Sequence, residues 1–137
     1  MNVKNFMTSE VHKVTLDMTV RKAIVLLTSN KISGAPIVDH LQNVVSVVSE
    51  GNLLKLAAAK SLDKLISDCL NQLPKTSSLI TLSTSSSFAD VYRLFLSNPI
   101  HRIIITDANG RLQGIVSRSN VLRILVGNGG DSAKTSE

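Results

Sequence analysis

The sequence is poor in the residues that carry disulfides, base stacking and membrane insertion. Its 137 residues include one cysteine, Cys69, so neither an internal disulfide nor a multi-cysteine zinc site can form. There is no tryptophan and aromatic residues make up 3%, which leaves little for the bases of a single-stranded nucleic acid to stack on. No apolar run approaches the roughly 20 residues of a membrane-spanning helix. The sequence therefore argues against a disulfide-stapled protein and a membrane protein.

Catalytic and metal-binding patterns are also missing. His12, His40 and His101 lie far apart and show no ligand spacing, and no Ser/His/Asp or Cys/His arrangement has a supporting motif. The amino end, "MNVKNFMTSE", lacks the charged start and apolar run of a signal peptide. We expect a cytoplasmic protein that is not an enzyme, holds no metal and does not enter a membrane.

What the sequence does have is an internal repeat of 68 residues. In each half, an apolar run ends on a serine and an asparagine follows three residues later. These residues are Ser49 and Asn52 in the first half and Ser117 and Asn120 in the second. Asp39 and Asp107 show the same separation. The repeat predicts two copies of one structural unit.

Each half reads as strand, helix, strand, strand, helix. Apolar residues at the i, i+3, i+4, i+7 spacing of a buried helical face start at Val20 and at Phe88, each after a capping candidate, Thr19 or Ser87. Two apolar runs separated by a turn follow, and the Asn109-Gly110 pair is a strong hairpin signal. The predicted fold class is α/β, with two pseudo-symmetric βαββα units packed as one module.

The expected boundaries follow the repeat. Residues 1–60 form the first unit, residues 61–126 a linker helix and the second unit, and residues 127–137 a disordered tail. The linker helix is expected to begin on Leu62, Leu65 and Ile66 and to loosen after Pro74. A unit of about 60 residues buries little surface alone, so we expect the halves to pack together and to form clefts in related pairs.

The repeated step from strand to helix has two interpretations. In the first, the unpaired N–H groups and the positive dipole at the start of each helix bind a phosphate. Ser49 or Ser117 then adds a hydroxyl hydrogen bond to the phosphate, and the side chain of Asn52 or Asn120 reaches the ribose hydroxyls. Alternatively, the same serines and asparagines only cap their helices. The net charge of +5 favours anionic partners without separating nucleotides from nucleic acids or acidic proteins.

From Val3 to Val126 the sequence resembles a tandem pair of cystathionine β-synthase (CBS) domains, the Bateman module. The resemblance rests on "FMTSEVHKVTLDMTVRKAIVLL" before "APIVD" and on "HRIIITDANGRLQGIVSRSNVLRIL". It implies two clefts that bind adenosine-containing ligands, such as AMP, ADP, ATP or S-adenosylmethionine. It also implies a homodimer of modules.

The resemblance assigns roles to individual residues. Ser117 and Asn120 match the phosphate-side hydroxyl and the ribose-binding position, and Ser49 and Asn52 are their counterparts. The other matched positions are Thr15 and Ser83 beside the base pocket, Ala35 and Ile103 whose backbone meets adenine, and the phosphate-binding pair His101 and Arg102.

The two halves differ in ways that favour the second as the stronger site. The first half has Ser33 and Gly34 at the positions of His101 and Arg102. It has Glu50 at the position where Arg118 adds positive charge. It has Ser46 at the position of Gly114, a glycine that would allow close approach of a backbone. Both ribose positions carry Asn where the family commonly has Asp.

The predicted function is a regulatory module that binds an adenine nucleotide and acts on a separate target protein through altered packing. The alternatives are a constitutive dimeric scaffold with vestigial clefts and a basic nucleic-acid-binding module. Five apolar residues on the last helix exceed what one internal face needs, which predicts a homodimer through that surface: Val121, Leu122, Ile124, Leu125 and Val126.

Overall fold

The chain forms two compact units that each contain a three-stranded sheet. The computed structural model describes residues 1–127. The β1–β3 unit comprises residues 12–79, and the β4–β6 unit comprises residues 1–11 together with the described residues from 80 to 127.

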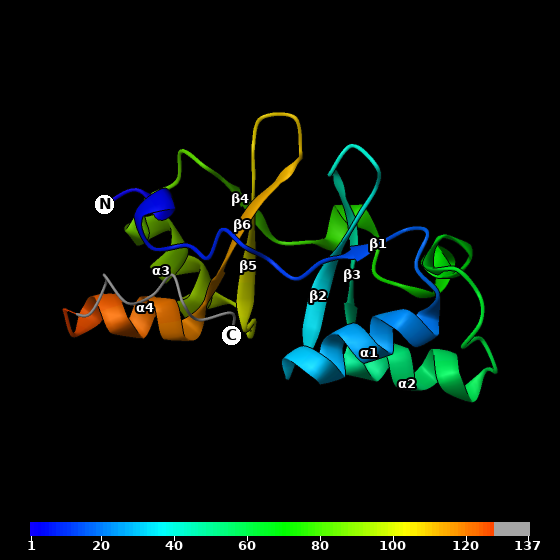
Figure 1. Ribbon diagram of the computed structural model, residues 1–137. Coiled ribbons are helices and arrows are strands. Elements are labelled where there is room, and N and C mark those ends of the chain that lie inside the picture. The colour runs from blue at the N-terminus through cyan, green and yellow to red at the C-terminus, as the bar shows by residue number, and fades with distance from the viewer. Residues whose placement is uncertain (128–137) are drawn as a thin grey trace. The chain divides into compact units, whose positions relative to one another are not determined.

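The β1–β3 unit has the order β1 (Val14–Thr15), α1 (Val20–Asn30), β2 (Gly34–Val38), β3 (Val44–Ser49) and α2 (Glu50–Ala58). β2 lies between β1, to which it is parallel, and β3, to which it is antiparallel. Helices α1 and α2 pack side by side (Figure 1). The predicted cap starts α1, because the Thr19 side chain accepts a hydrogen bond from Lys22 N at 3.1 Å.

The β4–β6 unit repeats this arrangement with β4 (Thr81–Ser83), α3 (Phe88–Ser97), β5 (Arg102–Thr106), β6 (Leu112–Ser117) and α4 (Arg118–Leu125). Its helices, and strands β5 and β6, each begin 68 residues after their counterparts. Ser87 caps α3 as predicted, and its capping box includes Asp90. The predicted α/β fold with two βαββα units is confirmed.

The amino-terminal segment packs with the β4–β6 unit and not with the strands that follow it. Its 3₁₀ helix, η1 (Val3–Asn5), precedes Phe6, and both Val3 and Phe6 are buried in a core shared with Val91 and Ile103. Backbone hydrogen bonds hold it there, including Phe88 N to Met1 O at 2.8 Å (Figure 1, blue). The unit boundary therefore differs from the one expected at the start of the sequence repeat.

The segment after α2 packs back on the β1–β3 unit. Ile66, Cys69 and Leu73 join its core, so the expected boundary after residue 60 separates residues that pack together. The expected helix from Leu62 is replaced by a 3₁₀ helix, η2 (Ile66–Gln72), followed by η3 (Thr76–Ser78). The helix starts late because residues 62–64 form a turn, in which Lys64 N donates to Ser61 O at 3.1 Å. Leu62 O and Lys64 O accept hydrogen bonds from the first residues of α1 and hold this turn in place.

Two sequence predictions concern the ends of the fold. Leu122, Leu125 and Val126 of the last helix region are exposed by 61%, 50% and 73%, as the surplus of apolar residues predicted. The expected disordered tail lies outside the described residues, except for Gly127. Within residues 1–127, no helix combines the length and apolarity that crossing a bilayer requires.

Candidate functional site

The step from β6 into α4 is built on a capping box. Ser117 N donates to Asn120 Oδ1 at 2.7 Å, and Asn120 N donates to Ser117 Oγ at 3.3 Å. Ser117 Oγ also lies 3.0 Å from the same Asn120 Oδ1. Ser117 is 2% exposed and Asn120 is 0% exposed.

The step from β3 into α2 has the same construction. Ser49 N donates to Asn52 Oδ1 at 2.9 Å, Asn52 N donates to Ser49 Oγ at 3.1 Å, and the hydroxyl donates to Oδ1 at 2.9 Å. Both residues are half-buried. Both serines therefore cap their helices, and both asparagines complete the capping boxes.

Capping changes what these residues offer a ligand. Asn52 Oδ1 already accepts two hydrogen bonds, so its remaining polar atom, Nδ2, is a donor and suits an oxygen acceptor on a ribose or a phosphate. At the start of α2, Glu50 N is bonded to Ser33 O, whereas Gly51 N has no acceptor among the described residues. The helix start is therefore less open to an anion than the sequence suggested.

The structure brings the predicted phosphate residues of the second half together. Arg102 lies directly opposite Ser117 in the β5–β6 ladder. His101 O accepts a hydrogen bond from Arg118 N at 3.3 Å, so His101 also borders the start of α4. The Arg118 guanidinium is held nearby, because its Nε donates to Ile100 O at 3.0 Å. Arg102 and the His101 backbone thus border the helix start at which Arg118 is the first residue.

Neutral and acidic residues occupy the same places in the β1–β3 unit. Gly34 pairs with Ser49, and Ser33 O accepts the hydrogen bond from Glu50 N at 3.0 Å. A carboxylate at the first turn competes with a phosphate for the positive end of a helix. The electrostatic difference between the halves that the sequence predicted is therefore present around the two helix starts.

Thr15 and Ser83 do not lie beside the serines of their own units. Thr15 pairs with Val38 at the far end of β2 from Gly34, and Ser83 pairs with Thr106 at the far end of β5 from Arg102. The two ends of each strand are four residue steps apart, about 13 Å. Their hydroxyls are also engaged locally, Thr15 with Asp17 at 2.6 Å and Ser83 with Ser85 at 2.6 Å.

Ala35 and Ile103 are core residues that are 5% and 0% exposed, with backbone and side chain counted together. β1 pairs with residues 37 and 38 of β2, and β4 pairs with residues 104–106 of β5, so neither edge strand extends along Ala35 or Ile103.

Gly114 has a different role from the one the sequence suggested. A Cβ at this position would lie 2.6 Å from Met7 Sδ and 2.9 Å from Thr8 O, so the missing side chain admits the protein's own amino-terminal segment. Thr8 and Ile115 exchange two backbone hydrogen bonds of 2.9 and 3.0 Å there. At the counterpart position, Ser46 Oγ donates to Pro74 O at 2.7 Å. The close approach is thus made by protein and not by a ligand.

Sequence reasoning missed Ser119. Its hydroxyl lies 2.8 Å from Ser117 Oγ at the start of α4. Its counterpart is Gly51, so a search for residues common to both halves passes over it. Within the described part of the chain, no group of three or more His, Cys, Asp or Glu side chains is placed to hold a metal ion.

The fold and the two capped strand-to-helix steps are those of a known class of tandem α/β modules. The sequence profile of the CBS domain matches residues 3–59 and again residues 70–127. The chain therefore belongs to the CBS domain family and contains two CBS domains.

The proteins that it resembles include a plant CBS protein and an archaeal protein. It is 30% identical over 147 residues to the chloroplastic CBS domain-containing protein CBSX2 of Arabidopsis thaliana, with 88% of this chain aligned. The chain spans 62% of the length of that relative. The solved structure of CBSX2 in complex with AMP has a TM-score of 0.77 at 30% identity, covering 92% of this chain and 96% of that one. The protein MJ1004 of Methanocaldococcus jannaschii gives 0.82 at 27% identity, over 93% of this chain and 60% of that one.

Proposed function

We propose that the protein is a non-catalytic regulatory module that binds an adenine nucleotide and acts on a separate target protein. The observation that carries this is the similarity to CBSX2, whose structure holds AMP and matches almost the whole of this chain. AMP, ADP, ATP and S-adenosylmethionine are the candidate ligands. We also propose that the chain works as a homodimer in the cytoplasm.

The helix start in the β4–β6 unit is the stronger candidate for the phosphate end of the ligand. Two arginines support this assignment: Arg102, which lies opposite Ser117, and Arg118, which is in the first turn of α4. A guanidinium binds phosphate oxygens through charge-assisted hydrogen bonds. Asn120 is the proposed ribose contact and Ile103 the proposed backbone contact to adenine. Ser49, Asn52 and Ala35 are assigned the same roles in the β1–β3 unit, and Thr15 and Ser83 remain proposed contacts to the base.

Calorimetric titration with adenosine, AMP, ADP, ATP and S-adenosylmethionine tests the proposal. Arg102→Ala should weaken ATP binding by roughly 1–3 kcal/mol and change adenosine binding much less, because adenosine lacks the phosphates. Arg111→Ala is the matched control, since it removes the same charge from an exposed residue in the hairpin turn. Equal affinity of the unmodified protein for adenosine and ATP would contradict the phosphate role of Arg102.

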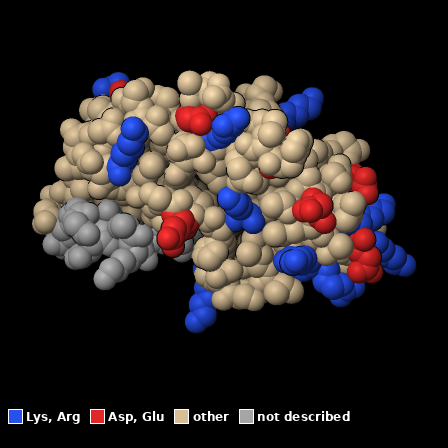
Figure 2. All heavy atoms as spheres, turned by 45° about the horizontal axis from the view of Figure 1, so that its top comes forward, with Lys and Arg blue, Asp and Glu red and all other residues tan. Residues whose placement is uncertain are grey.

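A dimeric scaffold is the second candidate, favoured by the capping boxes and by Glu50 at the start of α2. Failure of every nucleotide to bind at millimolar concentration would select it. A short DNA duplex in the same titration tests the nucleic-acid alternative, which predicts binding that weakens steeply with salt. On the face shown in Figure 2, acidic side chains lie among the basic ones, which argues against a continuous surface for a duplex.

A further inference from the structure

The tip of the β5–β6 hairpin holds an Asn-Gly pair that the β2–β3 hairpin does not have. Asn109 is exposed, and Gly110 follows it with φ 82°. The same repeat positions of the β2–β3 hairpin carry Leu41 and Gln42. An aspartate side chain accepts hydrogen bonds from backbone N–H groups in both turns. The two turns therefore share a construction and differ in the chemistry of this pair.

An Asn-Gly pair can undergo a reaction that consumes only water, and asparagine is one of the chemically labile residues of proteins. The backbone nitrogen of Gly110 attacks the side-chain carbonyl carbon of Asn109. The side-chain nitrogen leaves as ammonia, taking the Gly110 amide proton, and a succinimide ring closes. Water then opens the ring at one of its two carbonyls, which gives either aspartate or isoaspartate. No electrons are transferred, and the net change is one amide replaced by one carboxylate.

The residue after the asparagine decides how easily the nitrogen can attack. Glycine has no side chain to crowd the ring and reaches a wide range of backbone angles. Every other asparagine of residues 1–127 precedes a residue with a side chain. Asn43, in the β2–β3 hairpin, precedes the β-branched Val44 and donates from its side chain to Asp39 Oδ2 at 3.3 Å. The side-chain amide of Asn109 makes no hydrogen bond within residues 1–127, so it is free to turn toward the nitrogen.

The turn opposes the reaction through one hydrogen bond. Gly110 N donates to Asp107 O at 3.1 Å, and this bond must open before the nitrogen attacks. No residue from 107 to 111 is buried, and exposed loop tips are the parts of a fold that open at the lowest cost. We propose that Asn109 is a site of spontaneous deamidation in the folded protein and that its product weakens the β5–β6 hairpin.

The product disturbs the turn in two ways. The new carboxylate is two residues from Asp107, whose own carboxylate accepts hydrogen bonds from Asn109 N at 2.8 Å and from Arg111 N at 3.0 Å. Two neighbouring carboxylates repel each other. Isoaspartate also adds one carbon to the main chain, which disrupts the backbone hydrogen bond from Asp107 N to Arg111 O. The hairpin should then fray from its tip toward the pair formed by Thr106 and Leu112.

Incubation of the folded chain at neutral and at alkaline pH, followed by tryptic mass mapping, tests the site. Residues 103–111 form one tryptic peptide, which should gain the mass difference between an amide and a carboxyl group. The gain should be faster at alkaline pH, because the attacking nitrogen must lose its proton. Residues 32–55, which contain Asn43, are the internal control and should stay unchanged. A second Asn-Gly pair, at positions 128 and 129, falls in the separate peptide 124–134 and is not confused with the first.

The same incubation in urea shows how fast the pair reacts without the turn. If the peptide of residues 103–111 converts in the unfolded chain and stays unchanged in the folded one, the turn protects Asn109 and the proposal is overturned. Fragmentation by electron transfer then distinguishes isoaspartate from aspartate in the converted peptide.

Asn109→Ser tests the effect on stability, because serine suits a turn but cannot form the succinimide. Its resistance to urea should be the same before and after incubation, whereas the unmodified chain should lose resistance as peptide 103–111 converts. Equal losses in both proteins would show that the damage lies elsewhere and would overturn the effect assigned to Asn109. Fresh Asn109→Asp protein has the new charge without the added carbon, so it should lose less resistance than the converted chain. An equal loss would contradict the role given to the main-chain insertion.

Discussion

At the scale of single residues, the two hairpin turns differ at one position, where the backbone has positive φ and only one of the two turns has a glycine. Gln42 has φ 69° and its repeat counterpart Gly110 has φ 82°. Both lie in the left-handed region, which disfavours a residue with a side chain. The turns are otherwise alike, since Asp39 accepts hydrogen bonds from Leu41 N and Asn43 N, and Asp107 from Asn109 N and Arg111 N.

We expect Gln42→Gly to raise the free energy of unfolding by about 0.5 to 1 kcal/mol, because it removes the strain of a side chain at positive φ. The exposed hydrogen bond from Lys13 Nζ to Gln42 Oε1 is lost and offsets little of this gain. The converse change, Gly110→Ala, should lower the same quantity by about 1 kcal/mol. Urea denaturation measures both, and a destabilised Gln42→Gly protein would contradict the strain argument.

The capping box of α3 differs from those of α2 and α4 because it contains a carboxylate. Hydrogen bonds from the Ser87 backbone and side chain hold the pKa of Asp90 below its ordinary value, with Arg93 contributing and partial desolvation opposing. Ser87 N donates to Asp90 Oδ2 at 2.9 Å. A lowered pKa means that the ionised group stabilises the fold above about pH 4 and that this contribution is lost as the pH falls further.

Asp90→Asn should therefore reduce stability at pH 7 more than at pH 3. Asparagine still caps the helix, as Asn52 and Asn120 do, but has no charge to lose in acid. Urea denaturation at both pH values measures the difference between the unmodified and variant proteins. Glu10→Gln, which removes an exposed carboxylate outside any capping box, controls for net charge. A difference that stays constant between the two pH values would contradict the role given to Asp90.

At the scale of elements, the contact between β6 and the amino-terminal segment depends on Gly114. We expect Gly114→Ala to lower the free energy of unfolding by about 1–3 kcal/mol, because the new Cβ meets the Thr8 backbone, which cannot move without breaking the bridge to Ile115. The same substitution at Gly51 is the matched control. A Cβ there lies 3.7 Å from Ser49 Oγ, so Gly51→Ala should be neutral or stabilising. Similar effects of the two substitutions would show that the segment adapts to the added methyl group.

At the scale of the whole molecule, the units that fold together are not the units that repeat in sequence. A fragment of residues 12–79 contains all the core residues of the β1–β3 unit, whereas residues 1–60 lack Ile66, Cys69 and Leu73. We expect the first fragment to have more helix and a more cooperative thermal transition by circular dichroism. Residues 1–60 also carry Val3 and Phe6 without the core in which they are buried. Equal cooperativity of the two fragments would contradict the unit boundaries.

The sequence by itself determined the local features of the fold. The 68-residue period, the capping serines and the Asn109-Gly110 turn are set by side chains and backbone groups only a few residues apart, so their spacing is visible in the chain. The same holds for the charge difference around the two helix starts, since Arg118 and Glu50 occupy one repeat position.

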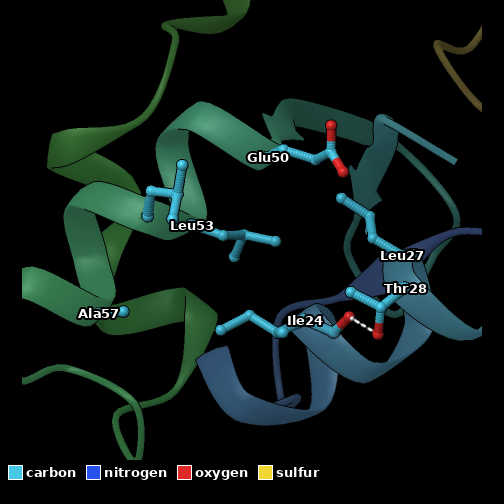
Figure 3. Close-up of a pocket in the computed structure, with 7 residues that line it drawn as sticks. Ile24, Leu27, Thr28, Glu50, Leu53 and Ala57 are labelled. Carbon is cyan, nitrogen blue, oxygen red and sulfur yellow. Dashed lines mark hydrogen bonds between the residues drawn. The ribbon is translucent and has the colours of Figure 1, made fainter.

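Only the tertiary structure decided where residues distant in the sequence meet. The packing of residues 1–11 on the β4–β6 unit gave Gly114 its role, and strand register put Thr15 at the far end of β2 from Ser49. The apolar hollow that lies between α1 and α2 beside Ala57 depends on the packing of these two helices (Figure 3). These features come from long-range packing, in which one residue type fits many different neighbours, so neither spacing nor composition could have predicted them.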